Sequence, residues 1–169
     1  MLRNCLLAFH FLILFFCFQP QLFAQFAPSI YINSQFALDD LSKNYNMGYG
    51  GGLSGHYSIH EDVGLLLSAG YVKIPGKEIS DSYLSYQLPA ITAFPINLGV
   101  DYTLTRHFFL RGQGGLLIFN EPEKVLGLSA SGGLGLRVSL FEFTTSLTHW
   151  KKDGHTNFVN LQLAYKFWR

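Results

Sequence analysis

Charged residues are scarce in this 169-residue sequence, at 14% of the chain, and neither sign dominates. Its only two cysteines, Cys5 and Cys17, lie near the start. The rest of the chain therefore has no disulfide, no thiolate metal site and no cysteine nucleophile. With twelve basic and eleven acidic residues, the chain also lacks the excess of positive charge that a nucleic-acid partner requires.

The first 24 residues have the pattern of a secretory signal peptide. Arg3 supplies the positive charge, an apolar run follows, and Ala24 is the small residue before the expected cleavage. The run is shorter than the roughly 20 apolar residues that a membrane-spanning helix needs. We therefore predict a signal peptide over residues 1–24 and one mature domain over residues 25–169. Removing Arg3 with the signal leaves eleven basic and eleven acidic residues.

Long apolar runs are absent after the signal, although the chain is 49% hydrophobic and 16% aromatic. A composition this apolar is unusual for a soluble domain, yet no segment could span a bilayer as a helix. Inside lipid, only helices and closed barrels satisfy their backbone hydrogen bonds. The sequence therefore favours a β-barrel. A soluble, lipocalin-like barrel with apolar residues inside is the alternative.

Residues alternate between apolar and polar in eight segments, as in half-buried strands. In the last of them, Val159, Leu161 and Leu163 share one face, while Asn160 and Gln162 share the other. The eight predicted strands cover residues 29–36, 47–59, 63–74, 91–104, 108–119, 125–139, 140–150 and 158–168. Short links at 60–62, 105–107 and 139–141 alternate with longer links at 37–46, 73–90, 120–124 and 151–157. The predicted fold is all-β, an eight-stranded antiparallel up-and-down transmembrane β-barrel.

Four motifs carry a family resemblance: residues 47–53, 63–71, 94–102 and 163–167. They resemble the small eight-stranded outer-membrane barrels of the OmpA/OmpX type, in particular the compact barrels of Bacteroidetes-like bacteria. The resemblance implies a monomer in the outer membrane of a Gram-negative bacterium, in contact with membrane lipid and lipopolysaccharide. It also implies that the barrel-assembly machinery recognises the C-terminal strand. The chain departs from the family by adding Trp168 and Arg169 after the terminal aromatic residue.

Aromatic residues recur about eight positions apart on the apolar faces. Tyr49 and Tyr57 are one such pair, and Phe94 and Tyr102 are another. Eight residues of a tilted strand rise roughly 20 Å along the membrane normal, which approximates the height of the apolar band. We predict aromatic girdles at the two membrane interfaces, formed by Tyr49, Tyr57, Tyr71, Phe94, Tyr102, Trp150, Tyr165 and Phe167.

Five charged residues fall on the predicted inward faces, close to a short turn or to the C-terminus: Asp101, Arg111, Arg137, Glu142 and Lys166. We expect them to meet at one level of the lumen. An eight-stranded barrel is just wide enough for side chains to fill it. The favoured interpretation is a structural ion-pair plug, and the alternative is a gate that re-pairs to open a pore.

The mature histidines predict no metal site and no cofactor, because no two show a metal-ligand spacing on one face. Residues 148–158 are faintly similar to the outer-membrane lipid A deacylases, which have a catalytic histidine at the position of His149. Lys151 replaces the serine nucleophile of that family, and the last strand has no glutamate. A histidine without a nucleophile or an orienting carboxylate cannot transfer an acyl group. We therefore predict a protein that is not an enzyme.

The predicted function is structural or interactive: envelope integrity, adhesion or ligand contact through the loops 37–46 and 73–90. The second loop contains Tyr83, Tyr86 and Leu88, which are more apolar than a loop without a binding role requires. These residues are an exposed contact surface or extend the adjacent strands above the membrane. A narrow passive pore for small solutes is the main alternative, and a lipid A deacylase is the remaining one.

Overall fold

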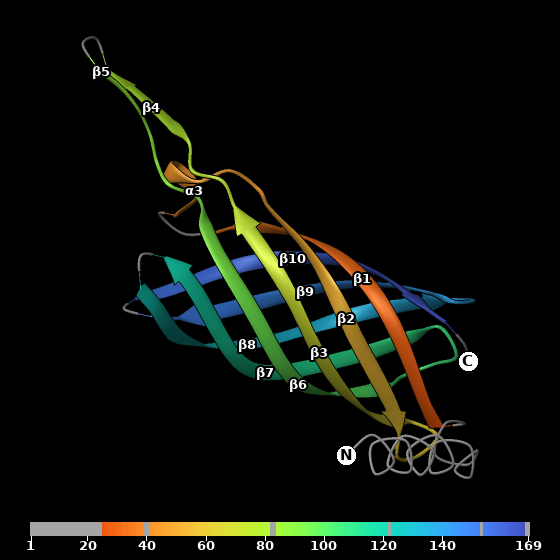
Figure 1. Cartoon of the computed structure of the whole chain (residues 1–169). Coiled ribbons are helices and arrows are strands. Elements are labelled where there is room, and N and C mark those ends of the chain that lie inside the picture. Colours follow the sequence, from red (N-terminus) through yellow and green to blue (C-terminus); the bar gives the residue numbers. More distant parts are fainter. Residues whose placement is uncertain (1–24, 39–40, 82–83, 122, 153, 168–169) are drawn as a thin grey trace, which may run out of the picture.

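Eight antiparallel strands form a closed barrel in this computed structural model (Figure 1). The structure describes residues 25–38, 41–81, 84–121, 123–152 and 154–167, so the predicted signal peptide and Trp168 lie outside the described residues. The barrel strands are β1 (Phe26–Ala37), β2 (Gly48–Ser58), β3 (Val63–Ile74), β6 (Ile91–Thr103), β7 (Phe108–Glu121), β8 (Glu123–Val138), β9 (Phe141–Lys151) and β10 (His155–Lys166). Their order around the barrel, β1-β10-β9-β8-β7-β6-β3-β2, brings the first and last strands together and confirms the predicted fold class.

The pairing register keeps the alternation of the sequence in phase around the barrel. Where β1 meets β10, Ile32 pairs with Leu163 on the outside and Asn33 pairs with Gln162 on the inside. Outward side chains are large and apolar; Leu98, for example, is 62% exposed. Inward positions hold most of the buried polar groups. A soluble barrel has the opposite arrangement, so the lipocalin-like alternative is wrong.

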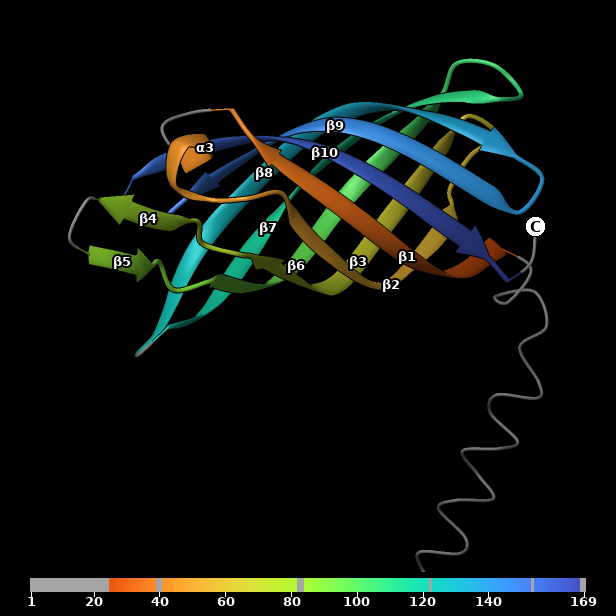
Figure 2. The ribbon, with the colours of Figure 1, turned by 90° about the horizontal axis from the view of Figure 1, so that it is seen from above.

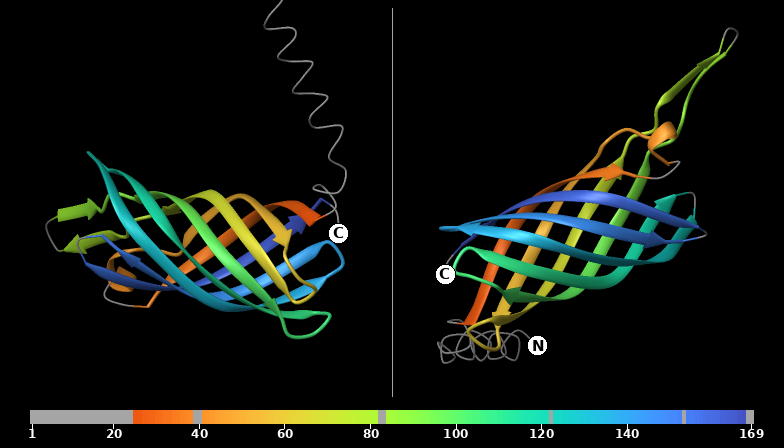
Figure 3. Two further views of the ribbon diagram at one scale, coloured as in Figure 1. Left: turned by 90° about the horizontal axis from the view of Figure 1, so that it is seen from below. Right: turned by 180° about the vertical axis from the view of Figure 1, so that it is seen from behind.

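The two ends of the barrel differ (Figures 2 and 3). At what we call the turn end, short connections at residues 59–62, 104–107 and 139–140 join the strands. The opposite end, the loop end, carries the other connections. The long link predicted over residues 120–124 is wrong, because β7 and β8 stay paired up to Glu121 and Glu123. Within the described residues, no helix is both long and apolar enough to cross a bilayer.

The loop end carries a short helix, α3 (Leu41–Asn44), and a separate hairpin of β4 (Glu78–Asp81) and β5 (Leu84–Gln87). Figures 1 and 3 show the hairpin projecting well beyond the barrel. Its base is fixed to the first loop: the Asn46 amide donates to the Pro75 carbonyl at 2.8 Å and the Lys77 amide donates to the Asn44 carbonyl at 2.8 Å. The Lys77 ammonium also donates to the Ser42 carbonyl, at 2.8 Å. The hairpin is therefore built on a hydrogen-bonded platform.

Candidate functional site

The turn end of the lumen holds all five predicted inward charges in one cluster. Arg111 makes a bidentate pair with Asp101, with both nitrogen–oxygen distances at 2.8 Å. Glu142 lies at the centre and is only 1% exposed. Its carboxylate oxygens lie 2.6 Å from Lys166 Nζ, 2.7 Å from Arg137 Nε and 3.2 Å from Arg111 Nη2. We call this group, with His56, the charge cluster.

His56 belongs to the charge cluster but is not among the five residues predicted from the sequence. His56 is only 7% exposed. Its Nδ1 lies 3.2 Å from Asp101 Oδ2, and its Nε2 lies 3.1 Å from Arg111 Nη2. The signal was present in the sequence: His56 has the inward parity of Ser54 and lies shortly before a turn.

Phe109 supports the cluster from one side and is fully buried. The guanidinium carbons of Arg111 and Arg137 each lie 4.9 Å from the centre of its ring. Gly135 faces the same ring, and a Cβ atom at that position would overlap it. Gly135 is therefore needed for the close approach of an aromatic ring that contacts two guanidinium groups.

Above the charge cluster lies a polar level with little free space. Asn33 donates to Asn160 of the adjacent strand β10 at 3.0 Å. Tyr31 projects inward opposite Gly52 and Gly70, whose missing side chains make room for its hydroxyl group. The remaining cavity is about 30 Å³, enough for one or two water molecules. The small residues on the inward faces accommodate side chains from other strands and leave no wide channel.

The loop end of the lumen is closed by an apolar plug, which consists of Val72, Ile74, Ala93, Leu117, Phe119, Trp150 and Phe158. Its aromatic rings pack together: the centre of the Trp150 ring lies 5.8 Å from that of Phe119 and 4.7 Å from that of Phe158. Leu41 of α3 and Tyr45 pack against the plug from the first loop. The lumen is thus filled by ion pairs at one end and by apolar side chains at the other.

The position of Trp150 differs from the one that we predicted. We expected it in the outer aromatic girdle, but it is 5% exposed and lies inside the barrel. The physical reason is parity: Trp150 is eight residues from Glu142 on β9, and residues an even number apart point to the same side of a strand. Glu142 points inward, so Trp150 does too.

The other predicted girdle residues lie on the outward side or just beyond the end of β10: Tyr49, Tyr57, Tyr71, Phe94, Tyr102, Tyr165 and Phe167. Several make edge contacts with neighbouring aromatic rings. The ring centres of Tyr71 and Phe94 are 5.3 Å apart, and those of Tyr165 and Phe167 are 5.9 Å apart. Their role at a membrane interface remains a prediction.

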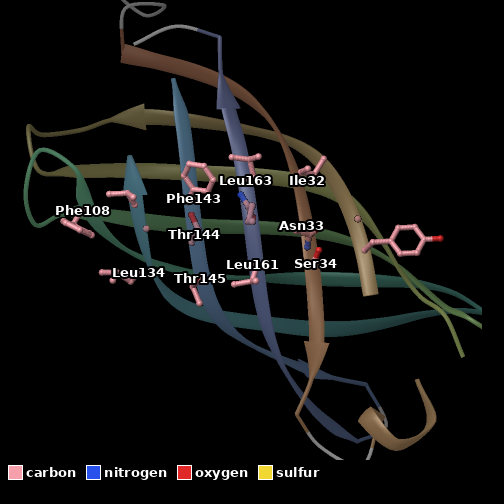
Figure 4. Close-up of a pocket in the computed structure, with 15 residues that line it drawn as sticks. Ile32, Asn33, Ser34, Phe108, Leu134, Phe143, Thr144, Thr145, Leu161 and Leu163 are labelled. Carbon is pink, nitrogen blue, oxygen red and sulfur yellow. The ribbon is translucent and has the colours of Figure 1, made fainter. Parts of the chain in front are cut away.

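An open groove of about 620 Å³ runs across the outer surface of the barrel wall (Figure 4). Its outward lining is mainly apolar and includes Ile32, Phe143 and Leu161, with Ser34 and Thr145 between them. The groove follows small residues in the outward layer. None of the residues that line the groove is charged, which fits a surface in contact with lipid chains.

His149, the candidate deacylase residue, lies on the outward side of β9 at the loop end. Its Nδ1 is 2.8 Å from Asn157 Oδ1, and its Nε2 is 3.0 Å from His155 Nδ1. Both ring nitrogens are thus engaged by partners that are neither a hydroxyl nucleophile nor a carboxylate. This arrangement does not support acyl transfer.

No family model matches this chain, and no curated protein matches it. Solved structures do. Ail, the attachment invasion locus protein of Yersinia pestis, is similar with a TM-score of 0.56 and 17% identity over 84% of this chain and 97% of Ail. The N-terminal barrel of Pseudomonas aeruginosa OprF gives a TM-score of 0.51 with 18% identity, over 82% of this chain and 97% of that one. Neisserial surface protein A gives a TM-score of 0.52 with 14% identity, over 85% of this chain and 97% of that one.

These similarities establish the fold and the resemblance to small eight-stranded outer-membrane barrels. A transmembrane β-barrel designed de novo is also similar, with a TM-score of 0.51 and 14% identity over 83% of this chain and 94% of the design. A fold that a design adopts does not by itself indicate a biological task. The function must therefore be argued from this chain's own surfaces.

Proposed function

We propose that this protein is a monomeric outer-membrane barrel with a closed lumen that acts as an attachment protein through its loop end. The observation that carries the proposal is the β4–β5 hairpin, which projects beyond a barrel filled at both ends. Envelope integrity, through contact with lipopolysaccharide, is compatible with the same architecture. The outward apolar surface supports a membrane location, and the short connections of the turn end support a periplasmic position for that end, because periplasmic turns are short in this architecture.

The hairpin has the character of a contact element. Ile79 and Tyr86 are a cross-strand pair, 48% and 60% exposed. Large apolar and aromatic side chains that remain exposed on a fixed platform are typical of interaction surfaces, since aromatic anchors contribute most of the binding energy at interfaces. The name of the similar protein Ail refers to attachment, which is consistent with this role.

Removing the apolar pair of the hairpin should weaken attachment without affecting the barrel. We expect the double substitution Ile79→Ser and Tyr86→Ser to weaken attachment by about tenfold or more, because both anchors of the hairpin are lost. The measurement is adhesion of a Gram-negative expression host that displays the protein to a panel of immobilised extracellular-matrix proteins and heparin. The control is His60→Ser, at the opposite end of the barrel. Equal adhesion of host cells with and without the protein would refute the attachment role.

The filled lumen argues against the passive-pore alternative. We expect neither the wild type nor Arg137→Ala to conduct ions in planar bilayers, because the apolar plug stays in place when the charge cluster is disturbed. The substitution should instead lower the free energy of unfolding, since it removes the 2.7 Å ion pair to Glu142. Discrete conductance steps that change with Arg137→Ala would support a gate and contradict the structural interpretation.

Assembly of the barrel offers a separate test of the membrane assignment. The predicted signal peptide and the C-terminal strand should direct the chain to the barrel-assembly machinery. Cell fractionation should find the protein in the outer membrane, with faster migration on electrophoresis before heating than after. Recovery in the soluble fraction would contradict the proposal.

A further inference from the structure

We propose that His149 and His155 together bind one divalent transition-metal ion, with Cu²⁺ preferred, on the outer surface of the barrel at the loop end. Histidine imidazole suits Cu, Ni and Zn among the common protein metals. The proposed site lies apart from the hairpin and from the filled lumen, so it goes beyond the attachment role.

The pairing of β9 and β10 places the two histidines side by side. Asn157 is opposite His149, and Lys151 is opposite His155, so the histidines are diagonal neighbours on the same outward face. The rings stack, with centres 5.1 Å apart and planes inclined by 26°. We predicted no two histidines with a metal-ligand spacing on one face, because the spacing within the chain does not reveal this contact between two strands.

The distance between the facing nitrogens matches a chelate. His149 Nε2 and His155 Nδ1 are 3.0 Å apart. With metal–nitrogen bonds of about 2.05 Å, such nitrogens subtend about 94° at the metal. That angle fits the tetragonal geometry of Cu²⁺ or Ni²⁺, whereas tetrahedral Zn²⁺ would need the nitrogens to move about 0.3 Å apart. In the usual order of affinities, Cu²⁺ also binds more tightly than Ni²⁺ or Zn²⁺.

Asn157 orients the first ligand. Its Oδ1 lies 2.8 Å from His149 Nδ1 and can only accept a hydrogen bond, so His149 carries its proton on Nδ1. The lone pair of Nε2 is then available on the side of His155. Such an outer partner fixes the tautomer of a metal-binding histidine. When the metal binds, His155 must present Nδ1 without its proton, which a shift of that proton to its Nε2 achieves without loss of charge balance.

The protein supplies two ligands, and the remaining positions are left to water or to an oxygen ligand from outside. Within the described part of the chain, no group of three or more histidine, cysteine, aspartate or glutamate side chains is placed to hold a metal ion. The site is therefore an open chelate on an exposed surface, unlike a closed structural metal centre.

Cu²⁺ titration of the untagged protein in detergent micelles tests the proposal. We expect one Cu²⁺ per chain, and electron paramagnetic resonance should show two nitrogen ligands. His149→Ala and His155→Ala should each weaken binding by about tenfold or more. Asn157→Ala should weaken it by about tenfold, because Asn157 no longer fixes the proton of His149 on Nδ1. The control is the double substitution His60→Ala and His107→Ala, which removes exposed histidines at the turn end and should leave the affinity unchanged.

Two results would overturn the inference. One is a wild-type spectrum with a single nitrogen ligand, which needs no variant to interpret. The other is binding that persists in His149→Ala but falls in the turn-end control, since that would place the metal at the other end of the barrel.

Discussion

Replacing Glu142 with glutamine is expected to destabilise the barrel by about 3–5 kcal/mol, because the substitution leaves buried cations without their carboxylate. Glu142 lies within 3.2 Å of Arg111, Arg137 and Lys166. Glutamine keeps the shape of the side chain but not its charge. Asp101 remains as the cluster's acid, and it already pairs with Arg111 through both oxygens. The measurement is the free energy of unfolding in urea, with the protein folded into lipid vesicles.

The matched control for this prediction is Glu61→Gln, which removes the same charge from an exposed position in the β2–β3 turn. We expect it to change the stability by less than about 0.5 kcal/mol. Adding Lys166→Met to Glu142→Gln should restore part of the free energy of unfolding, since it removes one of the cations left without a carboxylate partner. A cost below about 1 kcal/mol for Glu142→Gln would show that water already screens the cluster, as it screens exposed ion pairs.

The barrel could be predicted from the sequence because apolar and polar residues alternate along each strand. Shifting a strand by one residue would turn its whole apolar face inward, so the alternation determines both the faces and the strand count. The five inward charges were predictable for the same reason. Each has the inward parity and lies near the turn end, and neighbouring strands bring such positions together whatever the details of their packing.

Features that depend on contacts between strands were not predictable. His155 meets His149 through the register of paired strands, which local sequence does not specify. His56 is different, because its inward parity and its position near a turn could have placed it with the five charges. The β4–β5 hairpin was anticipated only as one of two interpretations of an apolar loop, and Tyr83 in that loop lies outside the described residues. Trp150 was a different kind of error. Its parity was readable, but an aromatic residue near a strand end was interpreted as part of a girdle.

Trp150→Ala should destabilise the barrel by about 3–5 kcal/mol, because it empties the centre of the apolar plug as well as removing a buried side chain. A lipid-facing aromatic behaves differently, because acyl chains fill the space that it leaves. Phe94→Ala is the matched control, since Phe94 is 40% exposed on the outer surface. It should cost less, about 1.5–3 kcal/mol, because the substitution leaves no internal cavity.

Fluorescence distinguishes the two orientations of Trp150 without relying on stability. Trp150 and Trp168 are the only tryptophans, so a Trp168→Phe background isolates the signal. In vesicles of brominated lipid, a tryptophan on the outer surface is quenched by contact with the acyl chains. Trp150 is enclosed by Phe119, Phe158 and the barrel wall, so its emission should be nearly unaffected. Strong quenching would place the side chain in the lipid and contradict the apolar plug, and with it the closed lumen that argues against a pore.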